Sequence, residues 1–364
     1  MISFLFYSLV STGAAPSVLP AELDYFDPAQ RSHALGPLIE SLGEGSDFQE
    51  LHSFLVYRHG KVVAEQYYSG NADYIDFPGG LERIAIADRK QWSASDPHYV
   101  ASVNKSVTAL LTGIWLSEQG RTTKQTLAPL LPEYQAYFSG SKKSALSVHH
   151  ILSMQTGFSW DEWDGDDLVQ LWRSNDFASF LLSQENSGPG REWRYNSAAL
   201  NLLFEAIQGT LPIPLDEWAT RRLYHPMGIT DFEWGRQPNG VAEASARLFL
   251  LPRDMLKLGV LILQEGYWEG KQLVPSLWIR QMCSVQAEGP AGFYGYGIWL
   301  REINGIPVCT AEGDGGQYIH VIAEKELVVV MTQGNYLQWP LYREQSDTIL
   351  RRLLEALEGP APDS

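Results

Sequence analysis

Segments with strand-like patterns lie near both ends of this chain, and a long stretch with helical patterns separates them. The strand segments are rich in Val, Ile, Leu, Tyr and Phe and are bounded by turn residues. They cover residues 54–57, 62–68, 297–300, 317–322 and 327–332. Because strands bury their apolar faces in a shared sheet, this order predicts an α+β domain built from both ends of the chain.

Apolar side chains at helical intervals dominate the middle of the chain, between loops rich in Gly, Asp and Pro. The predicted helices of this stretch cover residues 149–154, 168–172, 177–182, 198–208 and 215–223, and further helices are predicted at 103–118, 252–263 and 349–357. We therefore predict a discontinuous α/β domain, residues 21–125 plus 246–364, with a helical domain, residues 126–245, inserted into it. A cleft between two domains is a preferred location for a ligand site.

Size, charge and missing motifs narrow the classes of partner. The 364 residues can bury a large core without staples, and a formal net charge of −16 repels nucleic acid and anionic membranes. No apolar run is long enough to span a bilayer, so we expect no stable membrane insertion. The sequence holds no phosphate-binding glycine motif and no HExxH, so we expect no cofactor and no metal. The oligomeric state stays open.

The N-terminal segment leaves the cellular compartment undecided between a periplasmic or secreted location and a cytoplasmic one. Residues 2–10 are apolar and precede small residues and Pro16, as in a signal peptide, yet no Lys or Arg occurs before Arg31. Residues 1–20 are therefore either a signal peptide or an apolar segment packed on the domain. The spacing of the two cysteines, Cys283 and Cys309, does not decide whether they pair, and we expect two unpaired thiols in the core.

The motif Ser102-Val-Asn-Lys105, at the start of the predicted helix 103–118, carries the clearest chemistry. Residues at i and i+3 share a helix face, so the two side chains can form a hydrogen bond. A serine nucleophile needs an adjacent base, and burial beside the positive end of a helix lowers the pKa of a lysine toward that role. The helix start also offers the Ser102 N–H to an oxyanion. The alternative is that Ser102 only caps the helix.

The same S-x-x-K pattern occurs a second time, at Ser139-Gly-Ser-Lys142, so the pattern alone is weak evidence for catalysis. This second copy lies in a polar stretch with no apolar helix behind it, and we interpret it as a solvated loop.

Three other stretches contain candidate site residues. Tyr195 precedes the predicted helix 198–208; its phenol can donate and accept a proton, and a Lys105 ammonium nearby would favour the phenolate. Gly313 and Gly315 lie in a glycine-rich turn that allows a close approach to substrate. Trp160 opens an acidic aromatic stretch that offers a pocket wall and a negative charge for an amine. Their alternatives are a core tyrosine, a simple turn and a solvated loop.

With these elements in this order, the chain resembles the serine β-lactamase and penicillin-binding-protein superfamily. It is most similar to class C β-lactamase-like esterases and amidases, including those of the 6-aminohexanoate-dimer hydrolase type. The resemblance extends over roughly residues 50–357, with support at 54–63, 99–109, 150–157, 252–259 and 313–317. It implies a β-lactamase-like fold, an antiparallel sheet flanked by helices.

The resemblance also implies a role for each matching residue. Ser102 matches the acylated serine, Lys105 the lysine of S-x-x-K, and Tyr195 the proton-shuttling tyrosine of the Y-x-N/S motif. Ser197 takes the third position of that motif and is a candidate substrate-binding residue. The backbone N–H groups of Ser102 and Asp314 match the oxyanion hole. The implied function is a serine hydrolase that cleaves an ester or amide of a small substrate through an acyl-enzyme on Ser102.

One departure from the family bears on the substrate. The third family motif is usually Lys-Thr-Gly, and its lysine helps to hold a substrate carboxylate. Here the aligned residues are Ala311-Glu312-Gly313, so a carboxylate anchor requires an arginine from elsewhere. This favours neutral or amine-bearing esters and amides over β-lactams and D-alanyl-D-alanine peptides. A β-lactamase or DD-peptidase, and a non-catalytic descendant that binds a ligand in the same cleft, remain the alternatives.

Overall fold

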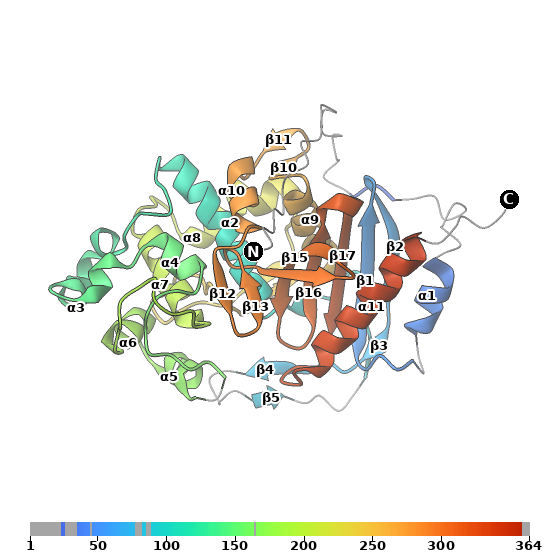
Figure 1. Cartoon of the computed structure of the whole chain (residues 1–364), viewed down its shortest axis with the longest axis horizontal. Coiled ribbons are helices and arrows are strands. Elements are labelled where there is room, and N and C mark those ends of the chain that lie inside the picture. Colours follow the sequence, from blue (N-terminus) through green and yellow to red (C-terminus); the bar gives the residue numbers. More distant parts are fainter. Residues whose placement is uncertain are drawn as a thin grey trace.

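The centre of the protein is an antiparallel sheet of eight strands, in the order β12-β13-β14-β15-β16-β17-β1-β2 (Figure 1). It belongs to a computed structural model that describes residues 23–25, 35–43, 46–76, 82–84, 89–163 and 165–358. The candidate signal segment, residues 1–20, lies outside the described residues. The sheet has the antiparallel form that the family resemblance implies.

Strands from the two ends of the chain meet inside this sheet. β1 (Leu51–Arg58) pairs with β17 (Leu327–Gln333) on one side and with β2 (Lys61–Tyr67) on the other. The other strands are β12 (Ala287–Gly289), β13 (Gly292–Tyr294), β14 (Trp299–Ile303), β15 (Ile306–Gly313) and β16 (Gln317–Ile322). Strands from both chain ends thus share one sheet, although the sequence did not indicate β12, β13 or β15.

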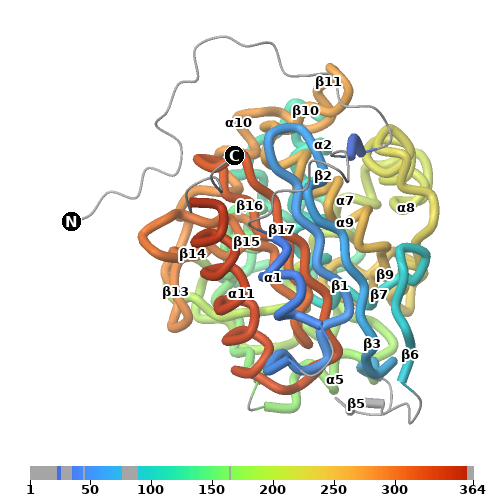
Figure 2. Tube along the Cα trace, turned by 90° about the vertical axis from the view of Figure 1, so that its right-hand side faces the viewer, coloured from blue at the N-terminus to red at the C-terminus, as the bar shows by residue number. Residues whose placement is uncertain are grey.

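Helices cover both faces of the sheet, which is why β1 and β17 are buried along their length. Side chains alternate across a strand: Phe54 and Val56 pack toward α1 (Leu35–Ser41) and α11 (Leu341–Glu358), which lie side by side in Figure 2. Leu55 and Tyr57 pack on the opposite side with α2 (Val103–Glu118) and α9 (Pro252–Leu263).

The middle of the chain forms a group of helices beside the sheet, on the left of Figure 1. They are α3 (Gln135–Phe138), α4 (Val148–Leu152), α5 (Asp167–Arg173), α6 (Phe177–Ser183), α7 (Ser197–Gln208) and α8 (Leu215–Ala219). The predicted helices of this stretch are thus present, and α8 continues through a π-helical turn, Thr220–Tyr224. The domain boundaries at residues 126 and 245 stay predictions.

Short elements connect these layers. Small ladders join β3 (Ser69–Gly70) to β6 (Lys90–Gln91), β4 (Tyr74–Asp76) to β5 (Glu82–Ile84), β10 (Tyr267–Trp268) to β11 (Lys271–Gln272), and β9 (Leu248–Leu250) to both β7 (His98–Tyr99) and β8 (Phe232–Trp234). Among the described helices, none combines the length and apolar character needed to cross a bilayer.

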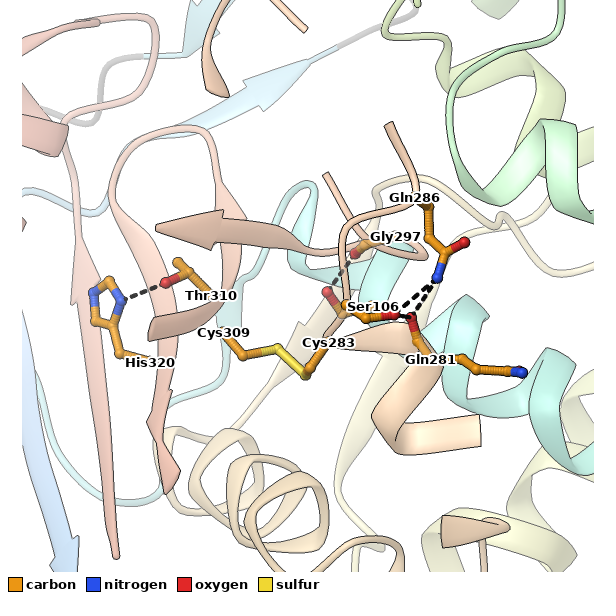
Figure 3. The surroundings of a disulfide bond; sticks show 9 residues. Ser106, Gln281, Cys283, Gln286, Gly297, Cys309, Thr310 and His320 are labelled. Carbon is orange, nitrogen blue, oxygen red and sulfur yellow. Dashed lines mark hydrogen bonds between the residues drawn. A yellow bond between two sulfur atoms is a disulfide. The ribbon is translucent and has the colours of Figure 1, made fainter. Parts of the chain in front are cut away.

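The two cysteines form a disulfide, so the expectation of two unpaired thiols is wrong (Figure 3). Cys283 ends α10 (Ser276–Met282) and Cys309 lies within β15, with their Cα atoms 5.7 Å apart. Sequence spacing could not show this, because only the folded chain brings α10 against that strand. The bond fastens the strand whose end carries Gly313.

Candidate active site

The turn before α2 brings Ser102 and Lys105 together. Ala101 has a left-handed backbone (φ 47°), and Ser102 then caps α2 with its side chain free of a capping bond. The Lys105 Nζ lies 2.8 Å from the Ser102 Oγ and donates to the Ser245 carbonyl at 3.0 Å. The i, i+3 contact predicted from the sequence is therefore present.

Burial changes the chemistry of Lys105. Its side chain is 1% exposed, and this burial lowers its pKa to about 8, although the charges of Glu162 and Glu243 act in the opposite direction. An amine with this pKa is uncharged in a useful fraction of molecules near neutral pH. It can then accept the proton of the Ser102 hydroxyl.

A buried loop, residues 243–246, supports the lysine. From α2, the Asn104 Nδ2 donates to the carbonyls of Glu243 (2.8 Å) and Ala246 (2.6 Å). The Glu243 carboxylate accepts from the N–H groups of Ser245 (2.9 Å) and Ala246 (2.5 Å). These bonds fix the Ser245 carbonyl that faces Lys105. The sequence did not indicate Glu243, because the loop is far from Ser102 along the chain.

Tyr195 lies on the other side of the same two residues. The Lys105 Nζ is 4.7 Å from the centre of its ring, and its hydroxyl forms a hydrogen bond with Ser102. Burial raises the pKa of the Tyr195 phenol well above its ordinary value, and the charge of Glu162 adds to this. The expected phenolate is therefore wrong, because the buried phenol keeps its proton.

The end of β15 passes directly against the Ser102 turn. A Cβ added at Gly313 would lie 2.3 Å from the Val100 carbonyl oxygen and 3.2 Å from the Ser102 nitrogen, so this close approach requires glycine. Asp314 follows at the lip of the cleft, and its carboxylate accepts from the Leu337 N–H at 2.9 Å. Burial raises the pKa of that carboxyl to about 6. Gly315 is turned away from the cleft, against the Tyr336 ring.

A cleft of about 1220 Å³ opens over these groups. Six tryptophans line it: Trp160, Trp163, Trp172, Trp193, Trp299 and Trp339. The Tyr195 ring stacks with both Trp163 and Trp299, whose ring centroids lie 5.5 and 6.0 Å away. Trp160 is among these lining residues, which agrees with its predicted position in a pocket wall.

Glu162 is a buried carboxylate in the cleft wall. It accepts from the Trp160 Nε1 and from the Ser197 N–H, both at 2.8 Å, and from the Ser197 hydroxyl. The acidic stretch around Trp160 was predicted to offer a negative charge, but Glu162 was not singled out. Its oxygens hold the start of α7, and with it the segment that carries Tyr195.

Arg343 enters the cleft from the first turn of α11. It brings a guanidinium into the same cleft lining as Glu312 of the Ala311-Glu312-Gly313 motif, and its charge acts on that carboxylate. The sequence carried no signal for it, because α11 is predicted only from residue 349. Among the described residues, no cluster of three or more His, Cys, Asp or Glu side chains is placed to hold a metal.

Comparison with known proteins agrees with this architecture. The fold is that of the serine β-lactamases and penicillin-binding proteins. The chain matches the Beta-lactamase family model over residues 52–343 and belongs to that family of hydrolases. It is 21% identical over 271 residues to the 6-aminohexanoate-dimer hydrolase of Paenarthrobacter ureafaciens, a match that covers 70% of this chain and 63% of that relative. The chain thus spans less than two thirds of that relative's length.

Solved structures share the fold at low sequence identity. One is a Bacillus anthracis protein whose assignment as a 6-aminohexanoate-dimer hydrolase is provisional (TM-score 0.72, 19% identity, 95% of this chain and 88% of that one). A penicillin-binding protein homologue from Caulobacter crescentus has a TM-score of 0.67 at 17% identity, over 90% of this chain and 98% of its own. EstCE1, a hydrolase with promiscuous acyltransferase activity, has a TM-score of 0.65 at 14% identity, over 87% and 98%.

Proposed function

We propose that this protein is a serine hydrolase that cleaves an ester or amide bond of a small substrate through an acyl-enzyme on Ser102. The observation that carries the proposal is the 2.8 Å contact between the Ser102 Oγ and the Nζ of a buried lysine with a pKa of about 8. A hydroxyl beside a largely desolvated amine has the adjacent base that a serine nucleophile requires.

Acylation follows from this geometry. The neutral Lys105 amine takes the Ser102 proton as the Oγ attacks the substrate carbonyl. The N–H groups of Ser102 and Asp314 donate to the oxyanion, since Gly313 holds the strand end against the nucleophile turn. Tyr195 gives its proton to the leaving oxygen or nitrogen. The Lys105 ammonium then returns a proton to Tyr195. Water, deprotonated by the same groups, then hydrolyses the acyl-enzyme.

The proposed substrate class is less narrowly defined than the proposed mechanism. Similarity to a 6-aminohexanoate-dimer hydrolase supports a linear amide, and similarity in fold to EstCE1 supports a wider hydrolase activity. The aromatic lining of the cleft suits an apolar acyl chain or leaving group. A β-lactamase or DD-peptidase activity is the second candidate, because Arg343 brings a cation into the cleft.

Labelling with a fluorophosphonate and turnover of a nitrophenyl ester test the proposal together. We expect one phosphonyl adduct on Ser102, and loss of at least about a thousandfold in kcat for Ser102→Ala with an unchanged fold. Ser139→Ala is the matched control, because Ser139 belongs to the second, exposed S-x-x-K. Full activity in Ser102→Ala would refute the assignment. Wild-type protein that neither reacts nor turns over would indicate a ligand-binding descendant, and nitrocefin turnover a β-lactamase.

A further inference from the structure

Two opposite charges on one wall of the cleft have no ion-pair partner among the residues that the structure describes. Glu312 is the residue before Gly313, and its side chain points from β15 toward the α11 side of the sheet, as that of Thr310 does. The Tyr318 hydroxyl lies 3.4 Å from its Oε1, while its Oε2 is buried without a hydrogen-bond partner in the described part of the chain. The carboxylate is thus poorly satisfied within the fold.

Arg343 is the other member of this pair. Its guanidinium is half-buried in the cleft lining and forms no hydrogen bond or ion pair with any described residue. The other cations of the cleft are engaged: Lys105 with Ser102 and Ser245, and Arg194 with Glu192 at 3.2 Å. Arg343 is therefore the cleft-lining cation, among the described residues, that is available to bind an anionic substrate.

The two charges act on each other without touching. Burial raises the pKa of Glu312 above its ordinary value, while the guanidinium groups of Arg301 and Arg343 act in the opposite direction and favour its charged form. No ion pair forms between Glu312 and Arg343, so neither side chain is locked onto the other. A substrate carboxylate that approaches Arg343 beside Gly313 would meet the field of Glu312 at the same time, and like charges repel over such distances.

We propose that Glu312 is a specificity-determining residue: its carboxylate offsets the attraction of Arg343 for anionic substrates and so selects neutral or cationic esters and amides. This rests on the proposed function, because it concerns which acyl groups reach Ser102. The rest of the wall supports it, since Asp314 and the exposed Glu288 add negative charge around the same cleft.

A pair of nitrophenyl esters of equal chain length, the hexanoate and the mono-adipate, tests this selection. The measured quantity is the ratio of kcat/KM for the anionic ester to that for the neutral one. We expect Glu312→Gln to raise this ratio about tenfold, the size expected of a partly screened charge at short range. Adding Arg343→Met to Glu312→Gln should remove the gain, because the arginine supplies the attraction.

Glu288→Gln is the matched control, since Glu288 is another cleft-lining carboxylate without a partner among the described residues. It should change the ratio less than about threefold. An unchanged ratio in Glu312→Gln, or an equal gain in Glu288→Gln, overturns the inference. If Glu312→Gln does not fold, Arg343→Met alone decides: the ratio should fall, and a constant ratio contradicts us. Ester turnover that persists in Ser102→Ala would instead contradict the proposed function.

Discussion

The floor of the cleft and its walls are built on different principles. On the floor, Lys105 and Tyr195 are buried, and each is tied to Ser102 by a hydrogen bond. On the walls, Trp163 and Trp339 are 65% and 64% exposed, and Arg343 has no ion-pair partner among the described residues. A buried network holds one geometry and tolerates little change. The exposed wall residues are less constrained, so under the proposed function we expect them to affect selectivity more than reactivity.

Among these variants, removal of the proposed base Lys105 should reduce activity most. We expect Lys105→Ala to lower kcat by roughly 10²- to 10⁴-fold, the usual contribution of general-base catalysis. Lys142→Ala, in the second S-x-x-K, should leave kcat unchanged because Lys142 is exposed. Steady-state kinetics on a nitrophenyl ester measure both. An unaltered kcat in Lys105→Ala would place the base elsewhere.

Opening the disulfide should weaken β15, the strand that ends at Gly313 against the Ser102 turn. Cys309 lies in β15, four positions before Gly313, so its bond to Cys283 fastens that strand to α10. Closing a loop of this length stabilises the fold by about 3.5 kcal/mol in the chain-entropy model. We expect the double variant Cys283→Ala/Cys309→Ala to lose about that much unfolding free energy in urea. The wall variant Trp339→Ala should change the unfolding free energy by less than about 0.5 kcal/mol. Equal losses in the two variants would contradict the idea that the disulfide, and not the exposed wall, stabilises the fold.

The pH dependence should separate the buried charges of the cleft from the exposed ones. Because Lys105 acts as a base only when uncharged, kcat/KM should rise with pH around a midpoint of about 8 and then level off. Glu162 favours the ammonium form, so Glu162→Gln should lower the pKa of Lys105 and move this midpoint to lower pH. Glu192→Gln, on the exposed wall and paired with Arg194, is the control. A midpoint that stays in place in Glu162→Gln would exclude this coupling.

The smallest effect should come from the aromatic wall. Trp163 stacks on Tyr195 but is largely exposed, so Trp163→Ala should raise KM for aryl esters about threefold to tenfold, the value of one aromatic contact. We expect kcat to stay within about twofold of the wild type. A larger loss in kcat than in KM would show that Trp163 positions Tyr195 and belongs functionally to the floor.

Local patterns were sufficient for several elements of the fold and site. α9 and β16 have the predicted bounds, and α2 begins and ends where its apolar spacing indicates. The contact between Ser102 and Lys105 was predictable because i, i+3 geometry belongs to any helix. β15 escaped notice because Pro307 and its mixed polar residues hide the strand pattern, and α11 begins earlier than 349 because its first turn is polar.

The sequence by itself therefore determined most of the longer helices and strands, the Ser102–Lys105 contact and the family, since each depends on neighbours along the chain. Only the tertiary structure decided the disulfide, the protonated state of Tyr195, and the entry of Arg343 and Glu243 into the site. The physical reason is that burial and long-range charge depend on which distant segments pack together. The protonation of Tyr195 and the pairing of the two cysteines therefore cannot be deduced from residues that are adjacent in the sequence.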